Sequence, residues 1–226
     1  MTHTHGASPP PVPPAAVPAW RLIVTLGGSG ALAGLLIVVG FTKSLPRIEA
    51  NKSAVLARAV TEVLKSPAKY DTLYLVDNAL TRELPTGRDP KELEKVYLGY
   101  DSTGVPTGYA IAAAGNGFQD EISLIFGYDP NTKRLLAMKI LGHKETPGLG
   151  DRIEKDTAYT SQFGRVKAPL VPVKRGNAKP NDSTNVQTIT GATISSKAVI
   201  KIISTAISRW DPLLAAVPAA AKGEAK

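Results

Sequence analysis

The longest hydrophobic run of the chain lies near its N-terminus. Twenty residues from Leu22 to Phe41 carry no charge. At about 1.5 Å of rise per residue, a helix of this length spans the hydrocarbon core of a bilayer. Trp20 and Arg21 precede the run and Lys43 follows it, as is typical of residues at membrane interfaces. We therefore predict a transmembrane helix over residues 21–43, after a proline-rich, disordered tail over residues 1–20.

A cleaved signal peptide is the alternative for this run. Its apolar stretch would usually be shorter, and no small-x-small cleavage site follows Phe41, so an uncleaved anchor is favoured. The side of the membrane stays open. Basic residues after the run outnumber Arg21 before it, which favours a cytoplasmic C-terminal domain, but large domains can translocate regardless of charge. The basic residues after the run are Lys43, Arg47, Lys52 and Arg58.

Beyond the anchor, the periodicity of apolar positions predicts helices at both ends of a set of strands. A helical pattern over 48–64 lies in a linker region, residues 44–89, and a second amphipathic helix is predicted over 195–210. Between them, alternating runs separated by turn residues predict strands over 96–100, 108–114, 121–128 and 134–141, followed by a short helix within 152–163. We expect an α+β domain of antiparallel strands with packed helices over residues 90–212, and a C-terminal tail over 213–226.

The composition narrows the chemistry. None of the 226 residues is a cysteine, which excludes disulfides, cysteine-ligated zinc and iron–sulfur clusters held by this chain alone. An electron carrier of this composition would need a cofactor without sulfur ligands, for which a flavin is the obvious candidate. The net charge is +8, but the basic residues are scattered singly among acids, so we predict no nucleic-acid binding.

A stretch of small and hydroxyl-bearing residues, Thr188 to Lys197, opens the last amphipathic helix. The first amide groups of a helix lack intrahelical acceptors and the helix dipole is positive there, so a phosphate would fit this position. Gly191 would let the backbone approach a ligand closely. The alternative is an ordinary N-cap, since Thr and Ser are favoured cap residues.

A second stretch, His143 to Asp151, places two glycines around a leucine after a proline. This pattern predicts a rigid turn that a ligand could approach closely, and Leu149 could press against a flat ring. A plain surface loop is the alternative. The two glycines, Gly148 and Gly150, do not form a dinucleotide-binding fingerprint, which also needs a βαβ unit.

Together, ETPGLGDRIEKD (Glu145–Asp156) and TGATISSKAV (Thr190–Val199) resemble the FMN-binding domain in the G subunits of Rnf-type ion-translocating electron transport complexes. The related C subunits of sodium-translocating NADH:quinone oxidoreductases share this pattern. The resemblance covers the whole layout of one N-terminal anchor followed by an FMN-binding domain.

The resemblance implies a covalent FMN, held by a phosphoester bond to Thr193 and installed from FAD by a separate flavin transferase. It also implies cofactor-binding roles for two sets of residues: Thr190, Gly191 and Ala192 in the first motif, and Thr146, Gly148, Leu149 and Gly150 in the second. The family's motif usually has Asp where this chain has Gln187, which bears on recognition by the transferase.

The resemblance further implies a bacterial or archaeal cytoplasmic membrane, with the FMN domain on the outer, periplasmic side. The partners would be the other membrane and soluble subunits of the complex, and the chain alone would not catalyse a complete reaction. His143, Lys144 and Glu145 could tune the flavin potential through nearby charge.

Three alternatives stay open. A membrane-anchored binding or scaffold protein could hold a phosphorylated ligand reversibly. A stand-alone membrane-anchored FMN carrier would have nearly the same sequence. A hydrolase with Thr193 or Ser195 as nucleophile would need a base, for which His143 and Lys197 are the candidates.

Overall fold

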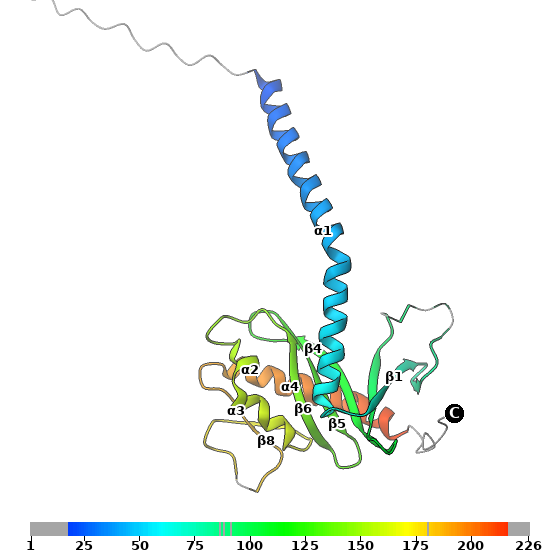
Figure 1. The fold of residues 1–226 in the computed structure, drawn as a ribbon. Coiled ribbons are helices and arrows are strands. Elements are labelled where there is room, and N and C mark those ends of the chain that lie inside the picture. Colours follow the sequence, from blue (N-terminus) through cyan, green and yellow to red (C-terminus); the bar gives the residue numbers. More distant parts are fainter. Residues whose placement is uncertain (1–17, 86, 88, 91, 180, 217–226) are drawn as a thin grey trace, which may run out of the picture. The chain divides into compact units, whose positions relative to one another are not determined.

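The computed structural model describes residues 18–85, 87, 89–90, 92–179 and 181–216. Most of the predicted tails, over 1–20 and 213–226, lies outside the described residues. The chain divides into two compact units, residues 1–52 and residues 53–226, of which the second holds the sheet. Figure 1 shows the elements in chain order.

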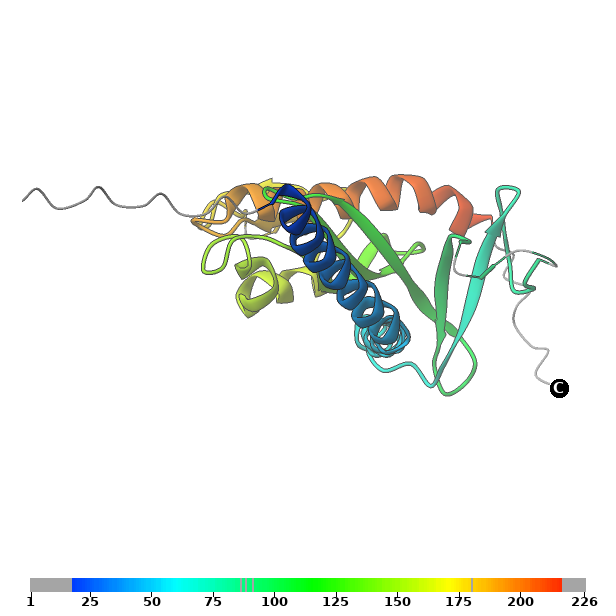
Figure 2. The ribbon, with the colours of Figure 1, turned by 90° about the horizontal axis from the view of Figure 1, so that it is seen from above.

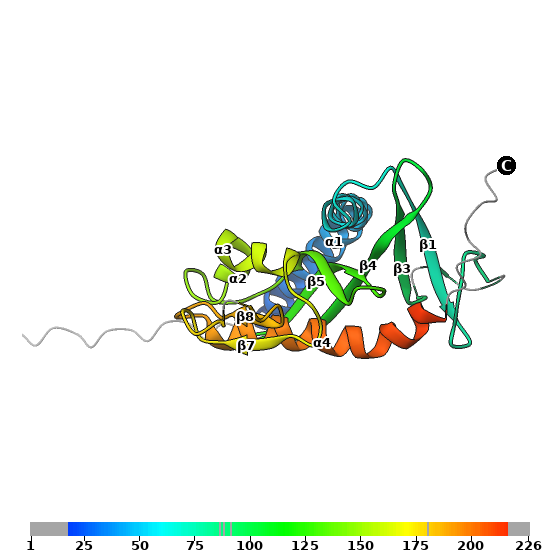
Figure 3. The ribbon, with the colours of Figure 1, turned by 90° about the horizontal axis from the view of Figure 1, so that it is seen from below.

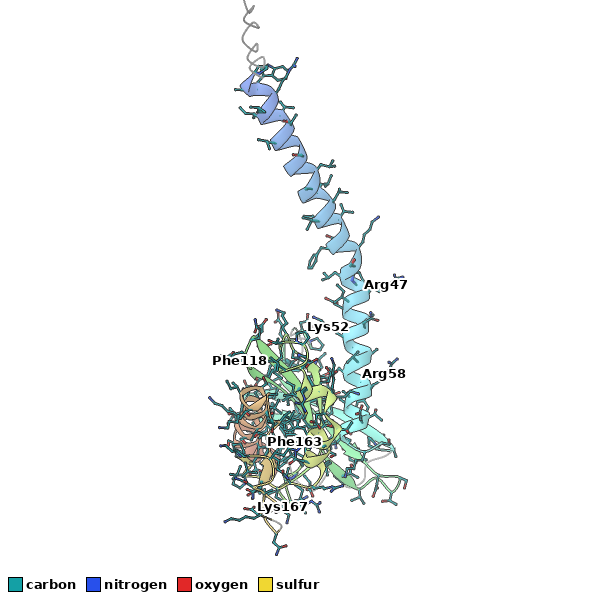
Figure 4. All side chains as sticks on the ribbon, turned by 90° about the vertical axis from the view of Figure 1, so that its left-hand side faces the viewer. Arg47, Lys52, Arg58, Phe118, Phe163 and Lys167 are labelled. Atoms are coloured by element: carbon teal, nitrogen blue, oxygen red, sulfur yellow. The ribbon has the colours of Figure 1, made fainter. Side chains whose placement is uncertain are left out.

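Helix α1 (Ala19–Val63) covers both the predicted anchor and the helix predicted in the linker region. It continues through Pro46, although a proline inside a helix removes one backbone hydrogen bond. The apolar side chains of its first half are exposed, and that half is long and apolar enough to cross a membrane. Figure 4 shows Arg47, Lys52 and Arg58 projecting from the second half of α1.

The second unit is built on an antiparallel sheet with the strand order β2-β1-β3-β4-β5-β6. Short turns join the four strands β3 to β6, so that each of these four lies beside the next one in the chain. The alternating sequence pattern predicts this arrangement. The strands are β1 (Lys69–Val76), β2 (Ala79–Thr81), β3 (Lys95–Tyr100), β4 (Pro106–Asn116), β5 (Glu121–Asp129) and β6 (Arg134–Gly142).

After the sheet, the chain forms short helical segments, a small parallel strand pair and one long helix. Helix α4 (Thr193–Ala215) lies along one face of the sheet (Figure 3). The shorter elements are α2 (Arg152–Lys155), α3 (Thr157–Thr160), the 3-10 helix η1 (Ser161–Gly164), and the paired strands β7 (Val171–Val173) and β8 (Asn185–Gln187). Figure 2 gives the view from above.

Each face of the sheet covers an apolar core. The larger core lies between the sheet and α4, where Val199, Ile203 and Trp210 form the buried stripe of the helix. The smaller core lies on the opposite face, where the last turns of α1 place Val60 and Val63 against the sheet. The amphipathic pattern of residues 195–210 therefore reflects packing, because only one side of α4 contacts the sheet.

The structure confirms the α+β class with an N-terminal apolar helix, and it changes several details. The sheet extends beyond the strands that were predicted, because β1 and β2 lie within the region described as a helical linker and pair with β3 and with each other. The short helix expected within 152–163 is divided into α2, α3 and η1. Helix α4 begins at Thr193, two residues earlier than predicted, and ends at Ala215.

Candidate functional site

The start of α4 is a helix terminus without a side-chain cap. The residue at the cap position is Ala192, which offers no hydroxyl, and Thr193 is the first helical residue. The alternative of an ordinary Thr or Ser N-cap is therefore not what the structure has. Free N–H groups and the positive end of the helix dipole at such a terminus favour an anion.

Thr193 is exposed, and its hydroxyl donates only a long hydrogen bond of 3.4 Å to the carbonyl of Ile189. The preceding Gly191 has φ 87, in the left-handed region that favours glycine, and no atom would lie within 4 Å of a Cβ at this position. Thr190 is exposed as well, and its carbonyl accepts a hydrogen bond of 3.0 Å from Arg152. The turn thus presents the Thr193 hydroxyl to solvent.

The second motif folds as a hydrogen-bonded turn. The carbonyl of Thr146 accepts from the N–H of Leu149 at 3.2 Å, and Gly148 takes φ 78. This turn holds Leu149 outward, with 54% of the residue exposed. An outward-facing leucine on a fixed turn has the placement that contact with a flat ring requires.

Glu145 joins the two motifs. Its carboxylate accepts a hydrogen bond of 2.5 Å from the hydroxyl of Ser195, in the first turn of α4, and the residue is only 4% exposed. The same carboxylate accepts from the backbone N–H groups of Phe118 at 2.8 Å and Gln119 at 3.0 Å. Three segments that are far apart in the sequence therefore meet at one side chain.

Two glycines leave the space that this carboxylate occupies. A Cβ added at Gly117 would lie 2.3 Å from Oε1 of Glu145, and one added at Gly150 would lie 2.4 Å from Oε2. Any larger residue at either position would have to displace the carboxylate. The missing side chain at Gly150 therefore lets Glu145 pack inside the turn.

The hydrogen bonds also decide the charge of Glu145. Burial acts to raise its pKa, but the hydrogen bonds from Ser195 and from the backbone of Gln119 and Phe118 outweigh burial, so the pKa lies below its usual value. Glu145 is therefore a carboxylate at neutral pH, held inside the site. A buried negative charge beside the start of α4 is favourable for the helix dipole.

The other two residues that were expected to tune a flavin, Lys144 and His143, have partners of their own. Lys144 forms an ion pair of 2.7 Å with Asp120, whose hydrogen bond raises the pKa of the lysine. The His143 ring lies between Glu154, at 3.2 Å from Nε2, and the N–H of Glu145, which donates to Nδ1 at 3.2 Å. Of the three residues expected to tune a flavin, Glu145 is the one that contacts α4.

Three exposed apolar side chains belong to the segments that meet at this buried carboxylate. Phe118 is 63% exposed and Ile194 is 59% exposed, and Leu149 is the third. Figure 4 shows Phe118 at the surface of the domain and Phe163 in its interior. The sequence analysis did not single out Phe118 or Ile194. A large apolar residue directly after a glycine in a hairpin turn was the available signal.

Gln187, which stands where the resemblance leads one to expect Asp, is engaged in structural contacts. Its backbone N–H donates to the side chain of Gln162 at 2.8 Å, and its own Oε1 accepts from the N–H of Gly176 at 2.9 Å. The side chain therefore fixes the loop between β7 and β8. It lies six residues ahead of Thr193 and shares a surface hollow with Asp156 and Arg175.

The hydrolase alternative finds no support in these contacts. Ser195 is only 3% exposed and its hydroxyl donates to Glu145, whereas the His143 ring contacts Glu154 and the backbone of Glu145. Among these side chains, no histidine accepts a hydrogen bond from a serine or threonine hydroxyl, which nucleophilic catalysis of this type needs.

One family of known proteins matches the segment that holds the candidate site. Residues 117–208 match the family described as "FMN-binding domain". This segment begins at Gly117 and ends within α4, so it contains Glu145, both motifs and the converging segments described above. The residues of the candidate site all belong to the part of the chain that the family covers.

Two relatives are similar to this chain over most of its length. The chain is 29% identical over 219 residues to the G subunit of the ion-translocating oxidoreductase complex of Cereibacter sphaeroides, covering 94% of this chain and 96% of that protein. It is 26% identical over 187 residues to the G subunit of the complex of the same name from Methanosarcina acetivorans, covering 83% and 92%. The resemblance to these G subunits that the two motifs predict is confirmed.

Solved structures agree on the fold. The C subunit of the Na(+)-translocating NADH-quinone reductase from Parabacteroides distasonis matches with a TM-score of 0.58 and 17% identity, covering 78% of this chain and 98% of that chain. NqrC of Shewanella oneidensis matches with a TM-score of 0.58 and 16% identity, covering 74% and 99%. The chain thus shares its fold with these two proteins.

Proposed function

We propose that this chain is the FMN-carrying subunit of a membrane-bound, ion-translocating oxidoreductase complex, and that its FMN is bonded through phosphate to Thr193. The observation that carries the proposal is the exposed Thr193 hydroxyl at an uncapped helix start, inside the segment that matches the FMN-binding family. The relatives named above are G subunits of ion-translocating oxidoreductase complexes and match over nearly their full length.

The residues at the start of α4 fit the phosphodiester that would join FMN to Thr193. The free N–H groups of the first turn and the helix dipole would stabilise its negative charge, and Gly191 removes side-chain bulk from the approach. The linkage would form when the Thr193 oxygen bonds to the FMN phosphorus of FAD. The pyrophosphate bond then breaks, AMP leaves, and the hydroxyl proton is released to solvent. A separate flavin transferase would catalyse this step.

The apolar side chains fit the ring of the same cofactor. Phe118, Leu149 and Ile194 would supply contact to a flat heterocycle tethered at Thr193, while their exposure would leave an edge open to a partner's cofactor. When bound, FMN would supply the acceptance and donation of electrons. The carboxylate of Glu145 would hold the three segments in place and add a negative charge behind them.

We further propose that the first half of α1 anchors the chain as a single span, with the second unit on the outer face of the cytoplasmic membrane. The length and apolar character of α1 support an anchor. The side follows from the resemblance and not from the charge distribution. Residues 90–212 would form the FMN-binding domain, and the remaining electron-transfer steps would belong to the other subunits.

Intact-mass measurement tests the covalent bond directly. Full-length chain produced together with a flavin transferase is expected to gain the mass of FMN less one water and to fluoresce under ultraviolet light in a denaturing gel. Thr193→Ala should abolish both signals. The matched control is Thr157, another exposed threonine at the start of a helix, whose replacement by Ala should leave both signals unchanged. Fluorescence that survives Thr193→Ala would overturn the proposal.

A further inference from the structure

Strand β4 runs past the end of its neighbour β3. The last pair between them is Val96 with Ile111, whereas β4 continues to Asn116 and stays paired with β5 on its other side. We call residues 112–116 the open edge. In an antiparallel strand, alternate residues direct their N–H and C=O groups to each side, so the open edge presents backbone groups that could pair with a further strand.

A groove runs along the open edge, between it and α4. Its volume is about 620 Å³. The strand packs closely on α4 at Gly115, because a Cβ added there would lie 2.9 Å from Cγ1 of Ile202 on that helix. The groove is lined by Ala112–Asn116 on the strand, by Leu93–Lys95 at one end, and by Ala198, Lys201, Thr205, Arg209 and Trp210 on α4.

The open edge lacks the features by which edge strands usually prevent pairing. Lysine, proline and bulges commonly block such edges, whereas this one has the sequence Ala-Ala-Ala-Gly-Asn. Over the part of the chain that the structure describes, no hydrogen bond from a loop or side chain covers its backbone groups. The edge is therefore accessible, and its small side chains leave room beside it.

The charge of the groove indicates what could bind there. Glu94 is paired with Arg209, and the ammonium of Lys95 donates to the carbonyl of Pro90 at 3.0 Å. Lys201 is exposed, and no acidic side chain among the described residues pairs with it. With three basic residues against one acid, the groove favours an acidic segment. A second copy of this chain would bring two Lys201 side chains together, which disfavours self-pairing.

The groove also leads to the candidate site. Asn116, at the end of the open edge, is followed by Gly117 and Phe118, which contact or flank Glu145. On the α4 side, Ala198 lies little more than one helical turn after Thr193. A segment bound in the groove would therefore end beside the exposed apolar side chains.

We propose that the open edge binds an extended, acidic segment of a partner protein in the complex, which adds to β4 as a further strand above α4. Backbone pairing would supply affinity and Lys201 would select the acidic sequence. The proposal rests on the proposed function in one respect, namely that the chain belongs to a complex. It assigns the surface that docks a partner near the flavin.

Site-specific photo-cross-linking in membranes that contain the complete complex tests this assignment. A benzophenone amino acid in place of Thr205, which lines the groove, is expected to cross-link to a segment of another subunit rich in Asp and Glu. The matched control is Ser208, which is exposed on α4 about one turn further along and does not line the groove. It should give at most one-tenth of the yield. Lys201→Glu should lower the Thr205 yield at least fivefold.

Hydrogen exchange gives the second measurement. Within residues 112–116, the amides that point away from β5 should exchange at least tenfold more slowly in the complex than in the isolated full-length chain, as pairing with a new strand requires. Absence of a cross-link at position 205, equal yield at 208, capture of a second copy, or unchanged exchange would each overturn the proposal. Covalent flavin is measured in every sample. Normal flavin content without docking would contradict the docking proposal and leave the proposed function standing. Loss of flavin in Lys201→Glu would show that the groove serves the cofactor instead.

Discussion

Two hydroxyl groups lie two residues apart at the start of α4, and their surroundings are opposite. Thr193 is exposed and donates a long hydrogen bond of 3.4 Å, whereas Ser195 is buried and donates to Glu145 at 2.5 Å. Both belong to one short motif, TGATISS. The comparison shows that one side of the helix start is available for chemistry while the other holds the site together.

The difference follows from helix geometry. Residues two apart on a helix are separated by about 200° of rotation, so one can face solvent while the other faces the TPGLG loop. The loop meets the helix through Glu145, and Gly150 leaves the space for that contact. We expect changes on the buried side to lower stability and changes on the exposed side to remove the flavin bond only.

Glu145→Ala should have the largest effect on stability. It would leave the Ser195 hydroxyl and the N–H groups of Phe118 and Gln119 without their acceptor, at a cost of about 3–5 kcal/mol in the free energy of unfolding. Urea unfolding of the full chain in detergent measures it. In a Trp20→Phe background, the buried Trp210 is the remaining tryptophan, and its fluorescence reports the unfolding of the domain. A change below about 1 kcal/mol would contradict the role given to Glu145.

Ser195→Ala should cost less, about 1–3 kcal/mol, because Glu145 keeps its two backbone donors. Thr193→Ala should stay within about 0.5 kcal/mol of the unchanged chain, as exposed substitutions usually do. The same urea experiment compares the two variants, and intact mass reports the flavin. Ser195→Ala should retain covalent FMN and Thr193→Ala should lose it. The opposite pattern would reverse the assignment of the two hydroxyls.

The two glycines of the turn Thr146–Gly150 should differ in the same way, one through packing and one through backbone conformation. Gly150→Ala would place a methyl group against Glu145 and should cost about 1–3 kcal/mol. Gly148 has open space around it but takes φ 78, so Gly148→Ala should cost about 1 kcal/mol through backbone strain alone. Unfolding measurements on both variants check the order. In the double variant Gly150→Ala/Glu145→Ala, the steric cost of the methyl group should fall but not vanish, because the Cβ of residue 145, which alanine keeps, would lie 2.8 Å from the added Cβ. The Gly148→Ala cost should be unchanged in the same background.

Much of the fold could be predicted because its patterns are local. The central strands alternate in sequence and are separated by turn residues, and the stripe of α4 repeats at helical spacing. Strand β1 was missed because Lys69 and Asp71 interrupt its pattern and its pairing with β3 joins residues far apart in the chain. Local patterns do not specify such pairing.

The candidate site divides along the same line. The exposed residues Thr193 and Leu149 could be singled out because they belong to short motifs with a recognisable order. The role of Glu145 could not, because a glutamate is rarely buried and its partners come from segments about 27 and 50 residues away. Phe118 was missed for a related reason, since a single exposed aromatic residue has no pattern of its own.

The last prediction concerns the pH dependence of the stability that the Glu145 carboxylate contributes. Its pKa in the folded chain is below the usual 4.5, so the carboxylate contributes its full stabilisation above that value. As the pH falls below about 4.5, the unfolded chain binds the proton first, and the contribution is lost as the pH passes through the folded pKa. The difference in unfolding free energy between the unchanged chain and Glu145→Gln should therefore be constant from about pH 7 to 5 and shrink between about pH 5 and 3.

Acids whose surroundings the substitution leaves unchanged titrate in both proteins and cancel in that difference, so urea unfolding of the pair at each pH reports on Glu145 and its immediate neighbours. A difference that stays constant down to about pH 3 would show that Glu145 is not held as a carboxylate by its donors. The contrast between the two sides of the helix start would then rest on packing alone.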